Sequence, residues 1–200
     1  MTKEQEIKNW LDRPMSHSQF NTWEWSVETW YNKYIKNIHE PETAELRFGK
    51  AFAKSIEDGT CEVKELVTKL PGQKEYPFNV VFNGIKLVGY ADDFCSKTFK
   101  QLNEVKTGRN AWTQKKVDNH DQLTMYCLMN YITNKIKPED VSITLYWLPT
   151  KETGDFEIEF IKPIKVYPFK TKRTMSDILR YGQYIKATRQ KMLEYAVNHA

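Results

Sequence analysis

Two extended runs separated by a short polar stretch constrain the fold of this chain more than any other feature. Residues 85–95 and 99–106 are rich in β-branched and aromatic side chains, so they predict two antiparallel strands joined by a tight connection. With the turn centred near residue 98, Asp92 lies directly opposite Glu104. Lys106 shares the face of Glu104, because side chains two residues apart on a strand point to the same side of the sheet.

This face places charges in largely apolar surroundings. Its other members are Val88, Tyr90, Phe94 and Leu102. Carboxylates opposed across two strands have Cβ atoms roughly 5 Å apart and repel each other, and burial raises the cost. A divalent cation would remove the conflict, because hard cations such as Mg²⁺ bind carboxylate oxygens, water and phosphate. The alternative is a solvated hairpin face with a Glu–Lys pair, and a register shift of one residue would abolish the arrangement.

Three motifs in this half of the chain resemble those of a known family. Residues 89–92 read Gly-Tyr-Ala-Asp, residues 104–108 read Glu-Val-Lys-Thr-Gly, and residues 122–126 read Gln-Leu-Thr-Met-Tyr. In this order and spacing they resemble the PD-(D/E)XK nuclease superfamily, and within it the RecB-type and phage-exonuclease-like branch. That branch has the pattern Gly-x-x-Asp, Asp/Glu-x-Lys-Thr-Gly and Gln-x-x-x-Tyr.

The resemblance implies a Mg²⁺- or Mn²⁺-dependent deoxyribonuclease and assigns roles to individual residues. The metal ligands that it implies are Asp92, Glu104 and the backbone carbonyl of Val105. Lys106 would position or activate the attacking water and stabilise charge on the phosphate, while the metal polarises it. Gln122 and Tyr126, which share a helix face at a spacing of four residues, would orient the substrate.

One position departs from the family pattern. Residues 47–57 resemble the first core helix, in which the RecB-type branch usually has a metal-binding histidine where this chain has Ala53. Glu57 lies one helical turn further on and would supply an acid on the same face. A solvated glutamate in the last turn is the alternative for Glu57. Ala53 itself is compatible with weakened metal binding, lost activity or an inactivating substitution.

The order of the predicted elements matches an α/β, restriction-endonuclease-like core of helix, antiparallel strand meander, helix and strand, with added N- and C-terminal helices. We expect helices at 2–11, 16–38, 43–58, 113–135 and 171–198, and further strands at 62–70, 76–82, 141–149 and 156–164. One domain is expected over residues 1–200, with no linker or repeat. Its parts are an N-terminal helical part (1–40), a catalytic core (43–149), and a closing hairpin strand with a C-terminal helix (155–200).

The basic residues near the predicted site suggest a nucleic-acid partner. Arg109, Lys115 and Lys116 cluster in the loop that follows the second motif, where they would contact the DNA backbone. A solvated lysine-rich loop is the alternative, and the net charge of +4 is only supportive. The expected partner is single- or double-stranded DNA, with its ends as the target. A recombination or single-strand-binding protein partner and an oligomer are further expectations of the resemblance.

The remaining composition bounds the compartment and the cofactor. No long apolar run or signal peptide is evident, so a cytoplasmic location is expected, or the host cytoplasm if the protein is phage-encoded. The three cysteines have no Cys-x-x-Cys spacing and are expected to be reduced thiols. They cannot supply the four-cysteine iron–sulfur cluster that some relatives carry.

The preferred hypothesis is an exonuclease of DNA recombination, repair or phage DNA processing. A nuclease-fold module that binds DNA or protein without cleaving is the alternative, and Ala53 favours it. A metal-dependent enzyme acting on RNA is a third hypothesis, although no feature of the sequence predicts recognition of a 2′-hydroxyl.

Overall fold

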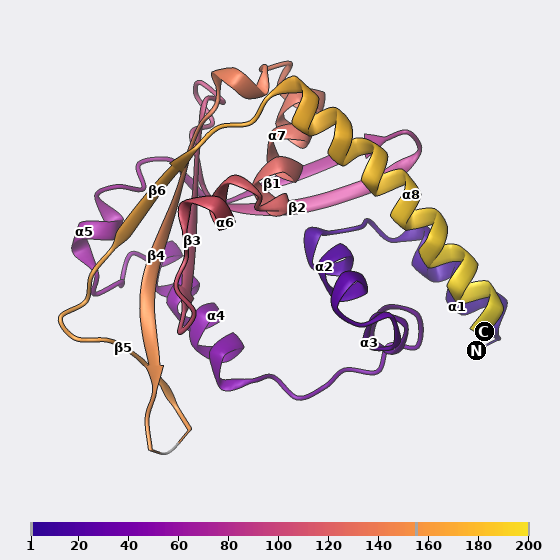
Figure 1. The fold of residues 1–200 in the computed structure, drawn as a ribbon, viewed down its shortest axis with the longest axis horizontal. Helices are drawn as coiled ribbons and strands as arrows, with labels where there is room; N and C mark the ends of the chain where they lie inside the picture. Colours follow the sequence, from indigo (N-terminus) through magenta and orange to yellow (C-terminus); the bar gives the residue numbers. More distant parts are fainter. Residues whose placement is uncertain (1, 155, 200) are drawn as a thin grey trace.

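The computed structural model describes residues 2–154 and 156–199, so positions 1, 155 and 200 of the predicted domain division lie outside the described residues. A six-stranded sheet forms its centre, with the order β1-β2-β3-β4-β5 and β6 paired with β4 (Figure 1). The strands are β1 (Gln73–Phe82), β2 (Ile85–Phe94), β3 (Gln101–Gly108), β4 (Ser142–Glu152), β5 (Ile158–Phe160) and β6 (Tyr167–Thr171). The predicted restriction-endonuclease-like α/β core is confirmed.

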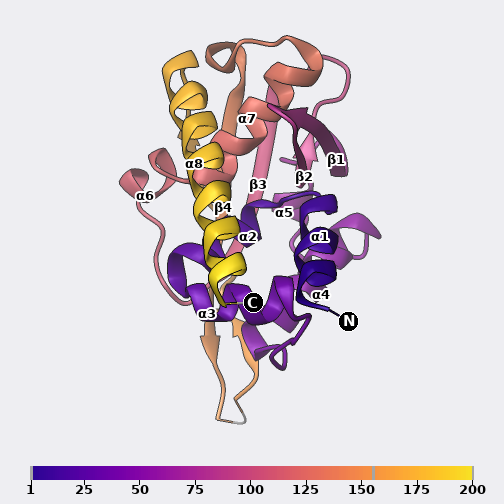
Figure 2. The same ribbon diagram turned by 90° about the vertical axis from the view of Figure 1, so that its right-hand side faces the viewer.

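Helices pack around this sheet, and the N-terminal helices lie to one side of it (Figures 1 and 2). They are α1 (Lys3–Asp12), α2 (His17–Trp25), α3 (Val27–Trp30), α4 (Ala44–Glu57), α5 (Lys64–Val67), α6 (Gln114–Asp118), α7 (Asp121–Asn134) and α8 (Met175–His199). A π-helical turn, η1 (Tyr31–Ile35), follows α3, and a 3-10 turn, η2 (Pro138–Asp140), precedes β4. Among the described residues, no helix is long and apolar enough to cross a membrane.

Alternating side chains divide the core into two clusters. In β4, Leu145 belongs to the larger cluster with α7 and α8, whereas Tyr146 belongs to the smaller cluster with α4 and α5. Successive residues of a strand point to opposite faces, so the sheet separates the two clusters.

The three cysteines are free thiols, as predicted.

The hairpin of β1 and β2 has the geometry that its sequence favours. Asn83 and Gly84 form its turn with φ values of 48° and 77°, as a type I′ turn requires. The pairing of β2 with β3 is much shorter, since only Asp93↔Asn103 and Phe94↔Leu102 are paired before the strands separate. On its other side β3 pairs in parallel with β4 along its whole length, over eight residue pairs.

Four predicted elements differ from the structure, each for a local reason. The predicted strand 62–70 is wrong, because its apolar residues recur at helical spacing and form α5. The predicted helix 16–38 is interrupted at Ser26, whose extended backbone ends α2 and whose hydroxyl accepts a hydrogen bond from Thr29 N–H to begin α3.

The other two differences lie further along the chain. The helix predicted over 113–135 is broken at Asn119 and His120 into α6 and α7. The final helix begins at Met175 rather than at residue 171, because β6 occupies 167–171. Thr174 and Asp177 cap α8 by reciprocal hydrogen bonds between side chain and backbone N–H.

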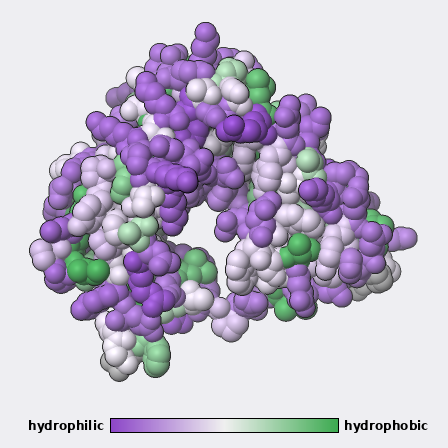
Figure 3. All heavy atoms as spheres, viewed as in Figure 1, coloured by the Kyte–Doolittle hydropathy of each residue, from purple (hydrophilic) through white to green (hydrophobic). Residues whose placement is uncertain are grey.

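The N-terminal helices lie beside the sheet rather than on it. Met15 joins the edge of β2 through a parallel bridge to Leu87, and Trp10 and Trp30 pack edge to face in the core shared with α8. The chain then returns to the sheet through an extended segment before α4. Figure 3 shows an opening through the molecule between this helical part and the part with α4 and β3, and much of its border is hydrophilic.

Candidate active site

The predicted site lies where β2 and β3 separate. The pairing of Asp93 with Asn103 extrapolates to Asp92 opposite Glu104, so the predicted register is correct. At that point the backbone hydrogen bonds between the two strands give way to a bond with a side chain: Val105 N–H donates to Asp92 Oδ2 at 2.6 Å. The two carboxylates therefore line a gap between diverging strands.

Asp93 holds the strands together just before they diverge. Its side chain is fully buried and accepts hydrogen bonds from Lys74 Nζ at 2.8 Å and from Asn103 Nδ2 at 2.6 Å. These partners belong to β1 and β3, so one carboxylate ties three strands together at this position. Such buried charge is tolerated because it is both paired and hydrogen-bonded.

Four of the five predicted catalytic residues form one chain of hydrogen bonds, with Asp92 beside it. Lys106 Nζ donates to Glu104 Oε1 at 2.6 Å and to Gln122 Oε1 at 2.9 Å. Gln122 Nε2 in turn donates to the Tyr126 hydroxyl at 2.7 Å, and that hydroxyl donates to the backbone carbonyl of Tyr90. The chain fixes the position of the Lys106 ammonium from two sides.

Glu104 is left incompletely satisfied by this network. Its side chain is 1% exposed, and its Oε2 atom has no hydrogen-bond partner among the described residues. A buried carboxylate oxygen without a partner is costly. A bound divalent cation would satisfy this atom, so the donor chemistry of Asp92 and Glu104 fits a hard metal ion.

Burial also perturbs the titration of these groups. Burial, and then the negative charge of Asp92, raise the pKa of Glu104 to about 8. Burial raises the pKa of Asp92 as well, against the opposing effect of Lys106. Burial lowers the pKa of Lys106, but Glu104 and Asp92 outweigh it and the net shift is upward. Without a cation, the site therefore carries less negative charge than two fully ionised carboxylates would.

A cavity of about 370 Å³ opens beside this network, between α4 and the ends of the strands. Asp92 and Lys106 line it from the sheet, and Ala53 and Glu57 line it from α4. The face of α4 predicted from its sequence therefore borders the site. The Glu57 carboxylate accepts a hydrogen bond from Lys54 Nζ at 3.0 Å, so its role as a metal ligand stays a prediction.

Glu75 is a further acidic residue that lines this cavity. It falls between the pairs Lys74↔Asp93 and Tyr76↔Ala91, directly opposite Asp92, yet it is unpaired. Its φ of 47° is uncommon for a residue other than glycine. Burial, and then the charges of Asp92 and Glu57, raise its pKa. No motif spacing in the sequence connects it to the site.

The carboxylates do not form a ready-made metal cage. Among residues 2–154 and 156–199, no three His, Cys, Asp or Glu side chains lie close enough together to hold one ion. The predicted ligands are Asp92, Glu104, the backbone carbonyl of Val105 and Glu57, and in this structure Glu57 does not join the other two carboxylates in a cluster of three. The ligand set stays a prediction.

Two histidines, His17 and His120, lie next to the network. The rings of His17 and His120 stack at 5.8 Å between centroids, and Trp112 lies 5.0 Å from His120. Burial, and then the charge of Lys106, lower the pKa of His17 to about 4 and that of His120 to about 3. Both rings are neutral near pH 7.

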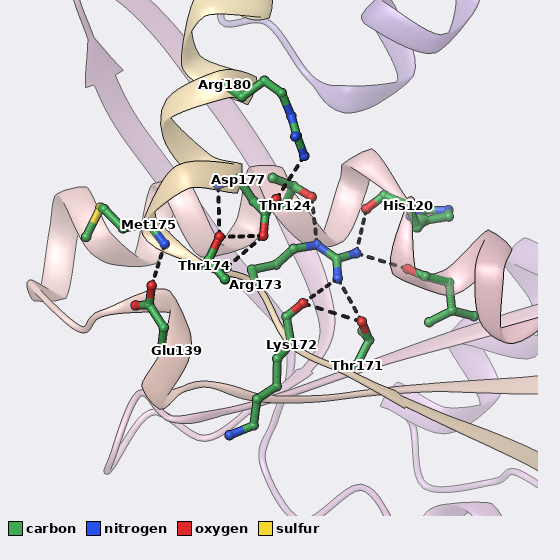
Figure 4. A network of polar contacts seen from close by, with 11 residues as sticks. His120, Thr124, Glu139, Thr171, Lys172, Arg173, Thr174, Met175, Asp177 and Arg180 are labelled. Atoms are coloured by element: carbon green, nitrogen blue, oxygen red, sulfur yellow. Dashed lines mark hydrogen bonds and ion pairs between the residues drawn. The ribbon is translucent and has the colours of Figure 1, made fainter.

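Arg173 holds the backbone at His120, just before α7, in place (Figure 4). Arg173 is 2% exposed. Its guanidinium donates to the carbonyls of Val117 and His120 at 3.0 and 3.2 Å, and its Nε donates to Thr124 Oγ1 at 2.8 Å. These contacts clamp the break between α6 and α7.

The residues predicted to contact DNA differ in the contacts that their side chains already make within the protein. Arg109 is ion-paired with Glu45 and Glu152, which ties the end of β3 to α4 and β4. Lys116 lies over the Trp112 ring at 4.3 Å, and Lys115 is exposed. Contact of all three with DNA stays a prediction.

Comparison with known proteins supports the fold. No protein-family model matches the chain, and no curated protein sequence does. Among solved structures, a protein from Eubacterium rectale that is provisionally named an exonuclease aligns over 100% of this chain and 88% of its own, with a TM-score of 0.59 and 11% identity.

A second neighbour points the same way. The alkaline exonuclease LHK-Exo from Laribacter hongkongensis aligns over 98% of this chain and 97% of its own, with a TM-score of 0.50 and 10% identity. Its complex with dAMP aligns over 98% of this chain and 100% of its own, with a TM-score of 0.53 and 11% identity. The chain therefore shares its fold with these proteins, and the resemblance seen in its motifs is confirmed at that level.

Proposed function

We propose that this chain is a divalent-cation-dependent deoxyribonuclease that acts as an exonuclease in DNA recombination, repair or phage DNA processing. The observation that carries the proposal is the buried hydrogen-bond chain from Glu104 through Lys106 to Gln122, beside Asp92, with one oxygen of Glu104 unsatisfied. The shared fold with an alkaline exonuclease and with its dAMP complex supports DNA as the substrate.

In this proposal each residue has a defined task. Asp92 and Glu104, with the carbonyl of Val105, would hold Mg²⁺ or Mn²⁺, which would polarise the scissile phosphate and acidify a bound water. Lys106 carries a fixed positive charge that would orient the water and stabilise the phosphate in the transition state. Gln122 fixes Lys106 from the side opposite Glu104.

The test is cleavage of end-labelled DNA. Single- and double-stranded substrates, with an RNA of the same sequence as competitor, are incubated with Mg²⁺, Mn²⁺ or EDTA. We expect metal-dependent release of nucleotides from an end, lost in Glu104→Gln. Glu62→Gln is the matched control, because Glu62 is exposed and does not line the cavity. Cleavage that survives Glu104→Gln would overturn the assignment of the site.

A second function is favoured by one observation. Ala53 lines the cavity at the position where the resemblance calls for a metal-binding histidine. A chain without that ligand would serve as a DNA- or protein-binding module on a nuclease fold. DNA binding without cleavage under any of these metal conditions, together with cleavage by Ala53→His, would identify this chain as an inactivated nuclease.

A further inference from the structure

The opening through the molecule lies next to the candidate site. In Figure 3 it separates the helical part with α2 and α3 from the part with α4 and β3, and much of its border is hydrophilic.

The perimeter of the opening is closed. Met15 N–H donates to the Lys86 carbonyl at 2.8 Å, and Val88 N–H donates to the Met15 carbonyl at 2.9 Å. The chain between these points passes through α2, α3, residues 36–43, α4, α5 and β1 before it returns to β2. We call residues 36–43 the strap. All of its residues are exposed, and Lys50 of α4 forms an ion pair with Glu42 in it.

Cavities lie along this perimeter, on both sides of the hydrogen-bond network that contains Lys106 and Gln122. The cavity beside Asp92 and Lys106 shares Leu46 and Lys50 with a second cavity of about 550 Å³, which the strap, α2 and α3 line. A third cavity of about 300 Å³ lies on the other side of the network, against Gln122 and its neighbour Tyr126. A continuous path thus leads from the strap to the proposed catalytic groups.

Exposed aromatic rings line cavities on both sides of the network. Trp25 lines the cavity at the strap and is 75% exposed, and Tyr90 lines the cavity beside Gln122 and is 54% exposed. Lys33 and Lys50 line the strap side as well. Stacking of bases on aromatic rings beside positive charges is how proteins hold single-stranded nucleic acid without regard to sequence.

We propose that a single strand of DNA is threaded by its free end through this opening, so that its phosphates pass Lys106 inside the closed perimeter that the strap completes. The inference rests on the proposed function for the identity of the strand as DNA. It adds strandedness and topology, because a closed perimeter admits a strand only by a free end. Linear single strands therefore enter, and circular ones do not.

The helical part stays attached when the strap is cut, which makes the idea testable. Tyr31 donates to the carbonyl of His199 at 2.9 Å, and the Tyr184 hydroxyl donates to Glu24 at 3.0 Å. With the bridge from Met15 and the aromatic core shared with α8, these contacts hold α1 to α3 in place without the strap. Cutting the strap opens the perimeter and leaves the fold.

The experiment measures trapping in EDTA, so that it does not depend on cleavage. Full-length protein is mixed with linear single-stranded DNA that carries biotin at both ends, streptavidin is added to block the ends, and the complexes are washed in high salt. Salt removes electrostatic binding, so only topologically held DNA stays. A protease site inserted after His39 cuts the strap, and the same site after Lys97, in the exposed turn between β2 and β3, is the control.

We expect the end-blocked linear strand to resist the high-salt wash and a circular single strand to be lost. Cutting after His39 should release the trapped strand, and cutting after Lys97 should not. Equal retention of linear and circular DNA, or trapping that survives the cut strap, would overturn threading. Cleavage of linear DNA without trapping would overturn this inference and leave the nuclease intact. Trapping without cleavage in Mg²⁺ or Mn²⁺ would support threading and overturn the proposed catalysis.

Discussion

Replacing Glu104 by glutamine should change how the stability of the metal-free protein depends on pH. Burial and Asp92 raise the pKa of Glu104 to about 8, from the ordinary glutamate value of 4.5. Between these two pH values the folded state holds a proton that the unfolded state has lost. The free energy of unfolding therefore falls as pH rises, by about 1.4 kcal/mol per pH unit for one group, and by roughly 4 to 5 kcal/mol across the full window.

Glutamine keeps the shape of the protonated carboxyl but does not titrate. We therefore expect the free energy of unfolding of Glu104→Gln to exceed that of the parent increasingly as pH rises from about 5 to about 8. The assay is urea unfolding in EDTA at several pH values, with Glu62→Gln as the control that should keep the slope of the parent. Adding Mn²⁺ should flatten the slope of the parent, because a cation favours the ionised carboxylate.

Parallel pH profiles for the parent and Glu104→Gln would refute the reasoning. They would mean that Glu104 ionises as freely in the folded chain as in the unfolded one. A slope that differs in EDTA but does not respond to Mn²⁺ would preserve the burial of Glu104 and remove its role as a metal ligand. The two parts of the argument are thus tested separately.

Three further predictions concern residues around the network. Gly89→Ala places a Cβ 2.8 Å from Cε1 of Tyr126, so we expect a loss of about 1–3 kcal/mol in urea unfolding and slower DNA cleavage; unchanged values would place Tyr126 elsewhere. Arg173→Met removes the donor to the carbonyls of the α6–α7 break and should cost about 2–4 kcal/mol, whereas a cost near zero would contradict the clamp. Ala53→His should strengthen Mn²⁺ binding in a calorimetric titration, and unchanged affinity would show that the face of α4 bearing Ala53 does not reach the ion.

The sequence alone determined the part of the site that depends on short-range periodicity. The two-residue period of a strand and the tight turn near residue 98 were enough to place Asp92 opposite Glu104 and Lys106 on the same face. The helical spacing of Gln122 and Tyr126 likewise predicted their shared face, and the structure joins them by a hydrogen bond. These relations are local, so no distant contact can change them while the elements persist.

Tertiary structure decided the relations that no local rule contains. Glu75 faces Asp92 only because β1 skips one pair at a left-handed residue. His17 reaches His120 only because α2 packs beside α7. The buried position of Arg173 depends on the break before α7, where it satisfies carbonyls that a continuous helix would have bonded itself. Each contact joins segments far apart in the chain, and packing, rather than periodicity, sets which segments meet.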